Sequence, residues 1–256
     1  MTHAKRRDTG WGAIAAGYAD GFTGKGDSYH ARVILPGVLR LIDPSAYRRV
    51  LEVGCGDGFF AAALAEAGAE VAACDIAAPM IEAAKKRSSA VEWAVAPAND
   101  LSRWQDESFD AVLIALALQN IEDYQGAIAE AARVLAEAGE LILILNHPAF
   151  RIPQKSSWGW DEETGTQYRR VDGYLSESRA TIDMDPGKGT GAHRTTISFH
   201  RPLQVYGKAL AKHGFAIAGI EEWISDRESQ PGPRAAAENG ARKEFPLFLM
   251  LRAVKI

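Results

Sequence analysis

Short apolar runs alternate with stretches of helical character along the first part of the chain. Residues 59–67, for example, are rich in alanine, which has a high helix propensity, and Gly68 closes this stretch. Apolar runs that alternate with helices predict a parallel sheet buried between two helical layers. We expect strands over 49–53, 70–74, 91–95, 109–116 and 140–145, with helices over 59–67, 79–87 and 124–137.

The second part of the chain departs from this alternation. Residues 147–201 contain three prolines, many glycines and a Trp-Gly-Trp cluster. Two alternating runs within them predict a β-hairpin across Asp185-Pro186-Gly187. Beyond Pro202 we expect a helix to Lys212, two antiparallel strands, and between these strands a long solvated loop with at most a short helical turn. The ranges are 178–184 and 194–200 for the hairpin, 215–224 and 245–254 for the strands, and 225–243 for the loop.

These elements together predict an α/β fold. Because parallel strands are joined by right-handed crossovers, the sheet should be doubly wound, Rossmann-like, mostly parallel and seven-stranded, with an antiparallel C-terminal strand. A chain of 256 residues with 47% hydrophobic residues has enough apolar material for one sizeable core. We therefore expect one domain over residues 1–256.

Charge and cysteine content narrow the classes of function. The net charge of −4 and the pI of about 5.9 disfavour nucleic acid as a partner and favour a small molecule. Cys55 and Cys74 lie in apolar stretches without metal-ligand spacing, so we expect neither a metal nor a disulfide. No signal-type or membrane-spanning apolar run is visible, and we expect a cytoplasmic protein without a membrane partner.

A glycine-rich turn over 51–58, Leu-Glu-Val-Gly-Cys-Gly-Asp-Gly, joins the first strand to the first helix. Glycines permit positive φ and let the backbone approach a ligand closely. A dinucleotide fold also places glycines here, but with the spacing GxGxxG, whereas this turn reads GxGxG. The carboxylates of Glu52 and Asp57 would repel a diphosphate and attract a cation, so the turn disfavours a nicotinamide cofactor.

On these residues the chain resembles the class I S-adenosylmethionine (SAM)-dependent methyltransferases, especially the bacterial small-molecule enzymes related to the ubiquinone and menaquinone methyltransferases. The resemblance implies that the segment from Glu52 to Gly58 holds the amino-acid part of SAM. It also implies that Asp75, about 20 residues further on, binds the ribose hydroxyls. Residues expected to bind the cofactor in this part of the chain are Glu52, Gly54, Cys55, Gly56, Asp75, Ile76 and Met80. Met80 also fits the buried side of a helix.

After the third strand, members of that family usually show an acidic residue that meets the adenine amino group. Here Pro97 stands in its place. We expect Ala98 and Asn99, or Asp100, to take over this contact, and Leu116 to edge the cofactor pocket.

Two segments should cover the site. The resemblance implies that residues 1–45 form an N-terminal lid, in which Tyr29 would contact the cofactor and His30 the substrate. It also implies that 147–201 form an inserted substrate cover. Trp158 and Trp160 would give this cover an aromatic surface for a planar or apolar substrate, although they fit a small core of the insert equally well.

Methyl transfer requires few catalytic side chains, because SAM carries its own leaving group. A neutral nucleophile benefits from a base, and His147 and His200 are the catalytic candidates. His147 follows the fifth strand, and Asn120 follows the fourth, at the edge where doubly wound sheets bind ligands. Asn120 would orient the substrate or cap the next helix.

The sequence thus predicts transfer of a methyl group from SAM to an O, N or C nucleophile of a small molecule. Three alternatives stay open: a methyltransferase acting on RNA or protein, for which Arg169 and Arg170 would supply basic surface, a nicotinamide-dependent oxidoreductase, and a non-catalytic SAM-binding protein. A homodimer is compatible with the sequence.

Overall fold

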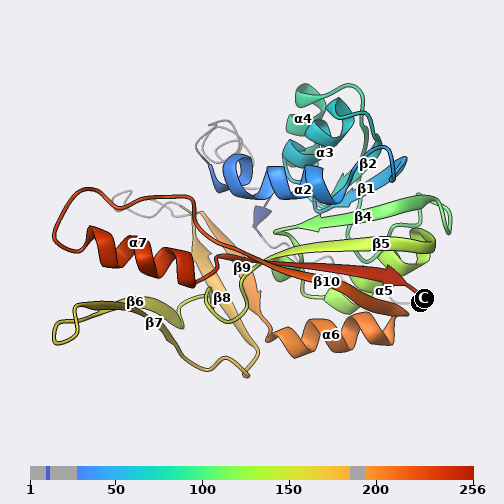
Figure 1. Cartoon of the computed structure of the whole chain (residues 1–256). Helices are drawn as coiled ribbons and strands as arrows, with labels where there is room; N and C mark the ends of the chain where they lie inside the picture. Colours follow the sequence, from blue (N-terminus) through green and yellow to red (C-terminus); the bar gives the residue numbers. More distant parts are fainter. Residues whose placement is uncertain (1–9, 12–27, 185–193) are drawn as a thin grey trace.

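A seven-stranded sheet forms the centre of the computed structural model, which describes residues 10–11, 28–184 and 194–256 (Figure 1). The strand order is β10-β11-β5-β4-β1-β2-β3. Neighbouring strands among β1 to β5 run parallel, and β11 runs antiparallel to both β5 and β10. The predicted fold class is confirmed. The bounds are β1 Arg49–Val53, β2 Glu70–Asp75, β3 Glu92–Val95, β4 Phe109–Ala115, β5 Leu135–Asn146, β10 Phe215–Trp223 and β11 Phe248–Lys255.

Helices cover both faces of the sheet because its strands are apolar on both sides. Alternate residues of β5 belong to different core clusters: Leu141, Leu143 and Leu145 face one side, and Ile142 and Ile144 the other. The first side packs against α5 (Tyr124–Val134) and α6 (Leu203–Lys212). The second side packs against α2 (Leu35–Leu41), α3 (Phe59–Glu66) and α4 (Ala78–Arg87). A five-residue π-helix, η2 (His30–Ile34), leads directly into α2.

The strand order reverses between β1 and β4, which places a topological switch point at their carboxyl ends. The turns that follow these two strands touch. A Cβ atom added to Gly54 would lie 2.6 Å from the Cβ of Ala117. The glycine-rich turn therefore lies at the position where open α/β sheets bind their ligands.

The segment between β5 and α6 contains two hairpins. The second, β8 (Ser178–Asp183) with β9 (Thr195–His200), was predicted, while its Asp185-Pro186-Gly187 turn lies outside the described residues. The first, β6 (Ser156–Asp161) with β7 (Thr166–Val171), was not predicted. The sequence of β6, Ser-Ser-Trp-Gly-Trp-Asp, lacks the regular apolar alternation of a strand.

The prediction of a loop over 225–243 was wrong, because α7 occupies Ala235–Glu244. Three alanines open this helix and give it helical propensity, and Ala241 is its buried residue. The ring of Phe245, which follows α7, packs edge-on against Phe150 and Trp158 of the insert. Tertiary contacts that the local pattern does not reveal thus stabilise the helix.

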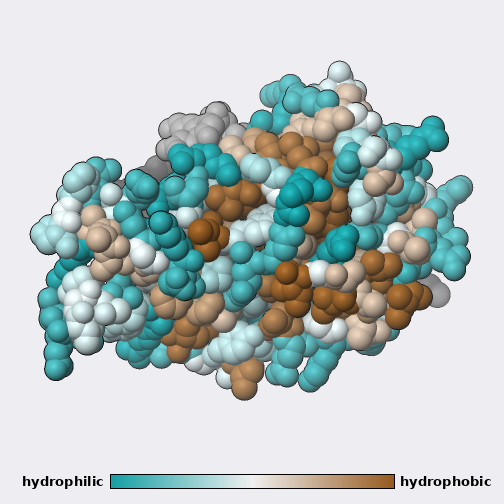
Figure 2. Space-filling view, viewed as in Figure 1, coloured by the Kyte–Doolittle hydropathy of each residue, from teal (hydrophilic) through white to brown (hydrophobic). Residues whose placement is uncertain are grey.

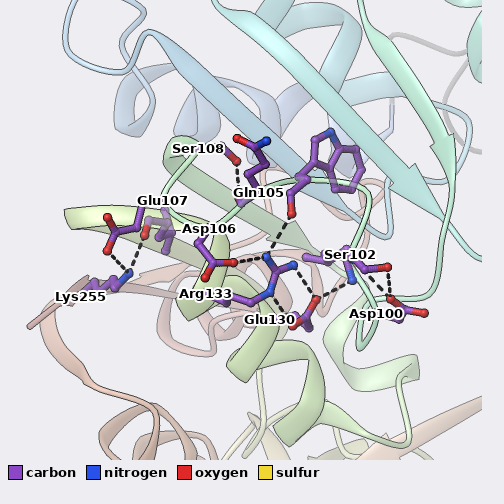
Figure 3. Close-up of polar contacts among 12 residues, drawn as sticks. Asp100, Ser102, Gln105, Asp106, Glu107, Ser108, Glu130, Arg133 and Lys255 are labelled. Atoms are coloured by element: carbon purple, nitrogen blue, oxygen red, sulfur yellow. Dashed lines mark hydrogen bonds and ion pairs between the residues drawn. The ribbon is translucent and has the colours of Figure 1, made fainter.

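Polar contacts fasten the loop before β4 to α5 (Figure 3). The Arg133 guanidinium donates to the Trp104 carbonyl oxygen at 3.0 Å and to Asp106 at 2.7 Å, and it also bonds Glu130. A Glu130 oxygen accepts from the Leu101 N–H at 2.6 Å. Interactions with Glu130 and Asp106 raise the pKa of Arg133. This network fixes the path by which the chain enters β4.

Arg201 joins the end of β9 to the turn after β4. Its side chain is buried and donates to the carbonyl oxygens of Leu118, Ile121 and Glu122. The guanidinium also lies over the ring of Tyr124, 4.3 Å from its centroid. A buried cation with three carbonyl acceptors ties the insert to the sheet.

We expect Arg201→Met to lower the free energy of unfolding by about 2 to 4 kcal/mol, because it leaves three carbonyl oxygens without their donor. Urea unfolding followed by circular dichroism measures the loss. The matched control is Arg179→Met on β8, where the arginine is exposed. Its free energy of unfolding should stay within about 0.5 kcal/mol of that of the natural chain. Equal losses in the two variants would contradict the role given to Arg201.

Candidate functional site

The three glycines of the turn after β1 all have positive φ, at 72°, 56° and 79° for Gly54, Gly56 and Gly58. Two of them are required by packing. A Cβ on Gly54 would collide with Ala117, and one on Gly58 would lie 2.4 Å from the ring of Trp93. A Cβ on Gly56, by contrast, would meet no atom within 4 Å. The open space is therefore in front of Gly56, where a ligand can approach the backbone.

Asp75 ends β2 and fixes the position of Gly56. One carboxylate oxygen accepts from the Gly56 N–H at 3.0 Å, and the other accepts from the Ala77 N–H at 2.8 Å. Burial raises the pKa of Asp75, and these backbone donors oppose that effect. Each oxygen keeps a second lone pair, so Asp75 can accept hydrogen bonds from hydroxyl groups beside the turn.

Glu52 lies inside the sheet beneath the turn and is 1% exposed. Its Oε2 atom has no hydrogen-bond partner. Burial raises the pKa of Glu52 to about 8; a backbone hydrogen bond from Ala61 opposes the shift, and the carboxylates of Asp57 and Asp75 add to it. Glu52 is therefore largely protonated at neutral pH, and its contribution to a cation site is smaller than the sequence indicates.

Asp57 is not an open charge. Its carboxylate pairs with Arg87 of α4 at 2.5 Å. The Arg87 Nε also donates to the Asp57 carbonyl oxygen at 3.1 Å. Arg87 thus neutralises much of the charge of Asp57. Asp57 therefore attracts a cationic ligand less strongly than the sequence predicts. Cys55 is buried, and burial raises the pKa of its thiol, so only its backbone is at hand for a ligand.

On the adenine side of the predicted site, Ile76 is 39% exposed whereas Met80 is 1% exposed. Met80 packs with Ala77, and Trp11 and Met184 lie against the pair. The structure thus places Met80 in a small core cluster and leaves Ile76 at the surface next to Asp75.

Four further predicted cofactor and substrate residues are held by contacts within the chain. The Asn99 side chain donates to Asp123, the N-cap residue of α5, at 2.8 Å. Leu116 has a φ of 54°, and its carbonyl oxygen accepts from the Asn120 side chain at 3.2 Å. Ala98 packs against the main core cluster. The Asn120 side chain therefore closes the turn after β4, whereas the next helix, α5, is capped by Asp123.

Tyr29 and His30, the two candidate site residues of the predicted lid, reach the same edge of the sheet. The Tyr29 hydroxyl lies 2.9 Å from the Ser225 Oγ, and its ring meets Phe248 edge-on. The His30 ring stacks on Phe60 of α3 with centroids 5.8 Å apart. Burial lowers the pKa of His30; the negative charge of Asp57 opposes this effect, and the positive charge of Arg151 adds to it.

His147 has both ring nitrogens engaged. Nδ1 accepts from the N–H groups of Ala149 and Phe150 at 3.2 and 3.3 Å, so the proton belongs on Nε2, which donates to Glu222 at 2.7 Å. Burial lowers the pKa of His147, and Glu222 opposes the effect. This arrangement favours a fixed neutral tautomer and a positioning role over that of a base.

His200, the second catalytic candidate, ends β9 and is 4% exposed. Its Nε2 donates to the Tyr174 carbonyl oxygen at 2.7 Å, and the two rings are 6.1 Å apart. This bond joins β9 to the loop before β8.

Trp158 and Trp160 lie on one face of β6 and meet α7. Trp158 packs edge-on against Phe245, and Arg234 at the start of α7 lies over Trp160. Trp158 also carries the guanidinium of Arg169 on its face and stays 38% exposed. The two tryptophans thus contribute to the packing of the insert, while Trp158 keeps an open surface.

Sequence reasoning missed two residues near this edge, Arg151 and Phe150. Phe150 stacks on His147 with ring centroids 4.8 Å apart, and Arg151 follows it in the chain. Their position just beyond β5 was the available signal, because ligands of such sheets bind at that edge. In the described part of the chain, no group of three metal-ligating side chains gathers, and none of its helices has the length and apolarity to cross a membrane.

Comparison with known proteins agrees with this geometry. A family model described as a methyltransferase domain matches residues 51–143. The demethylmenaquinone methyltransferase of Clavibacter sepedonicus is 36% identical over 107 residues, which is 41% of this chain and 43% of that protein. The ubiquinone biosynthesis O-methyltransferase of Xanthomonas campestris pv. campestris (strain B100) is 36% identical over 121 residues, or 46% of each protein. These matches span less than half the length of the curated relatives.

The structural similarity covers more of the chain than the sequence similarity does. A crystal structure of an S-adenosylmethionine dependent methyltransferase from Mesorhizobium loti has a TM-score of 0.67 and 24% identity. The superposition covers 86% of this chain and 96% of that one. At this identity the likeness shows a shared fold.

The bonds of His147 predict a graded response to substitution. His147→Ala removes the acceptor for two N–H groups and the donor to Glu222, and should cost about 1 to 3 kcal/mol of unfolding free energy. His147→Asn keeps an acceptor oxygen where Nδ1 stands, so it should recover part of the loss. Urea unfolding measures both. Equal losses would exclude the capping role, and activity restored to His147→Ala at high pH would support a base instead.

The raised pKa of Glu52 predicts a pH-dependent stability. Because the pKa rises from its ordinary 4.5 to about 8 in the folded chain, the stabilisation by Glu52 is complete below pH 4.5. It is lost as the pH rises through about 8. Relative to Glu52→Gln, the natural chain should thus lose a few kcal/mol between pH 5 and pH 9, as measured by urea unfolding.

The matched control is Glu66→Gln at the end of α3, which removes an exposed carboxylate. Its stability should follow that of the natural chain at every pH. Parallel curves for Glu52→Gln and the natural chain would contradict the protonation of Glu52.

Proposed function

Because this chain belongs to the class I SAM-dependent methyltransferases, we propose that it transfers the SAM methyl group to an oxygen, nitrogen or carbon nucleophile of a small molecule. The observation that carries the proposal is the open space at Gly56, beside Asp75 and at the switch point of the sheet. Backbone groups with positive φ and a carboxylate with spare lone pairs suit the amino-acid and ribose parts of SAM.

The proposed cofactor residues act mainly through backbone and shape. Gly54, Cys55 and Gly56 offer main-chain groups, Asp75 offers its carboxylate, and Ile76 an apolar surface beside it. Met80 packs beneath the start of α4, Ala98 against the main core cluster, and Leu116 in the turn after β4 against the second cluster. Asn99 is bonded to Asp123, so recognition of adenine rests on the backbone of the segment that contains Pro97.

SAM supplies an activated methyl group when bound, so the chain has to align the acceptor and exclude water. Tyr29 and His30 close the site from η2, and residues 147–201 close it from beyond β5. We assign positioning roles to His147 and His200, since each holds a carbonyl, carboxylate or backbone N–H in place.

The acceptor cannot be carried over from the relatives. Their names refer to demethylmenaquinone and to ubiquinone biosynthesis, but the family model ends at residue 143, before the proposed cover begins. We propose a small-molecule acceptor, with the lid over 1–45 and the cover over 147–201 as parts of one domain. The acidic pI disfavours RNA as the alternative substrate.

A cytoplasmic location and a homodimer are further parts of the proposal. The two cysteines are buried and free, as suits a reducing compartment. The edge strand β10 exposes Ile217 and Ile220, and Ile224 follows it, so apolar residues gather over this edge (Figure 2). Apolar surface on an unpaired edge strand suits contact with a second copy.

Gly56→Val should abolish SAM binding, because its side chain would fill the open space in front of the turn. Calorimetric titration with SAM and with its demethylated product measures the loss. Gly165→Val is the matched control, since Gly165 has a similar φ of 62° and equally open surroundings in the β6–β7 turn. Both variants should lose similar stability from strained backbone, and only Gly56→Val should lose affinity.

Transfer of labelled methyl to a panel of phenols, amines and quinone-like compounds tests the activity itself. Unchanged SAM affinity in Gly56→Val would refute the site. Tight SAM binding without transfer to any compound would favour the non-catalytic SAM-binding protein.

A further inference from the structure

Arg151 places a guanidinium at the carboxyl edge of the sheet. It lies just beyond β5, with its guanidinium carbon 5.2 Å from the ring centroid of Phe248 at the start of β11. Its N–H donates to the His147 carbonyl oxygen at 2.8 Å, which fixes the backbone. The charge of Arg151 acts on His30, as does that of Asp57 in the glycine-rich turn. Because Tyr29 packs against the same Phe248 ring, Arg151 lies beside the Tyr29 and His30 segment of the predicted lid.

No carboxylate pairs with Arg151 among the residues that the structure describes. Burial lowers the pKa of Arg151; Tyr29 opposes the effect, and Arg169 adds to it. A half-buried guanidinium without a counterion is costly, because desolvation is not offset by an opposite charge. A ligand that carries negative charge would remove this cost.

A second cation lies close by. The Arg169 guanidinium donates to the Phe150 carbonyl oxygen at 2.8 and 2.6 Å and to the Ser156 Oγ at 2.9 Å. These acceptors fix its position but carry no net charge. Burial lowers the pKa of Arg169 as well. The charges of the two guanidiniums act on each other, and that of Arg169 lies over the Trp158 ring, so positive potential gathers here.

The carboxylates around this edge are already engaged. Asp57 pairs with Arg87, Glu222 accepts from His147, and Asp226 pairs with Arg32. Each of these three carboxylates thus has another partner, and none of them pairs with Arg151.

We propose that the methyl acceptor carries a carboxylate, which Arg151 binds at the carboxyl end of β5, with Arg169 adding positive potential. The inference rests on the proposed function and specifies its substrate class. A planar guanidinium matches a carboxylate through two parallel hydrogen bonds, a geometry that a neutral amide does not reproduce. Trp158, which is 38% exposed beside Arg169, adds aromatic surface, so an aromatic acid is the form of acceptor that we test.

The test compares aromatic acids with their primary amides. Calorimetry in the presence of S-adenosylhomocysteine measures the binding of hydroxybenzoic and indole carboxylic acids, each paired with its amide. In the natural chain at least one acid should bind about 10- to 100-fold more tightly than its amide. Arg151→Gln should abolish this preference and leave SAM affinity unchanged.

Two further variants make the result specific. Arg170→Gln removes the neighbouring exposed arginine, which pairs with Asp172, and should keep the preference. Arg151→Lys keeps the charge without the planar fork, so it should retain part of the preference even if Arg151→Gln does not fold. An intermediate preference in this variant supports the assignment.

Two results would overturn the inference. One is that no acid binds at least tenfold more tightly than its amide. The other is that Arg151→Gln lowers the affinity for SAM and S-adenosylhomocysteine but keeps the preference for acids over amides. Arg151 would then bind the methionine carboxylate of the cofactor. Absence of SAM binding by the natural chain would instead overturn the proposed function, and the titration with SAM alone separates that failure from this one.

Discussion

The hydrogen bond from the Gly56 N–H to the Asp75 carboxylate joins the turn after β1 to the end of β2, and the geometry of the site depends on it. The same carboxylate accepts from Ala77, which starts the path into α4. Gly54 meanwhile packs against Ala117 beyond β4. Three strand ends are thereby held in register, and Gly56 is the glycine of this turn that packing leaves uncovered.

Two carboxyl groups lie at this junction in different electrostatic environments. Asp75 accepts from two backbone donors at its two oxygens, which offsets part of the cost of burial. Glu52 has an oxygen without a partner, and its pKa rises to about 8. Because protonated Glu52 carries no charge, the sheet can bury it near Asp75 without repulsion between two carboxylates. Of these two carboxyl groups, Asp75 is therefore the one whose charged form the backbone stabilises at both oxygens.

The sheet was predictable because its strands are buried on both faces, so the apolar runs are continuous in the sequence. The hairpin of β6 and β7 and the helix α7 were not, since their stabilising contacts join residues distant in sequence, such as Trp158 and Phe245. The glycine-rich turn was visible in its spacing, and the family resemblance pointed to Asp75. The bonding of His147 was not, because its partner Glu222 lies 75 residues away.

The end of β5 is where the cofactor half and the proposed substrate half of the chain meet. The contacts of the glycine-rich turn described above lie within residues 52 to 117, whereas Phe150 joins the end of α7 to His147 beyond β5. His147 accepts the Ala149 and Phe150 N–H groups on its ring and the Arg151 N–H on its carbonyl oxygen. One buried residue therefore sets the direction in which the chain leaves the sheet. A substitution of His147 should therefore displace Arg151 and weaken binding of the methyl acceptor, while the glycine-rich turn keeps its conformation.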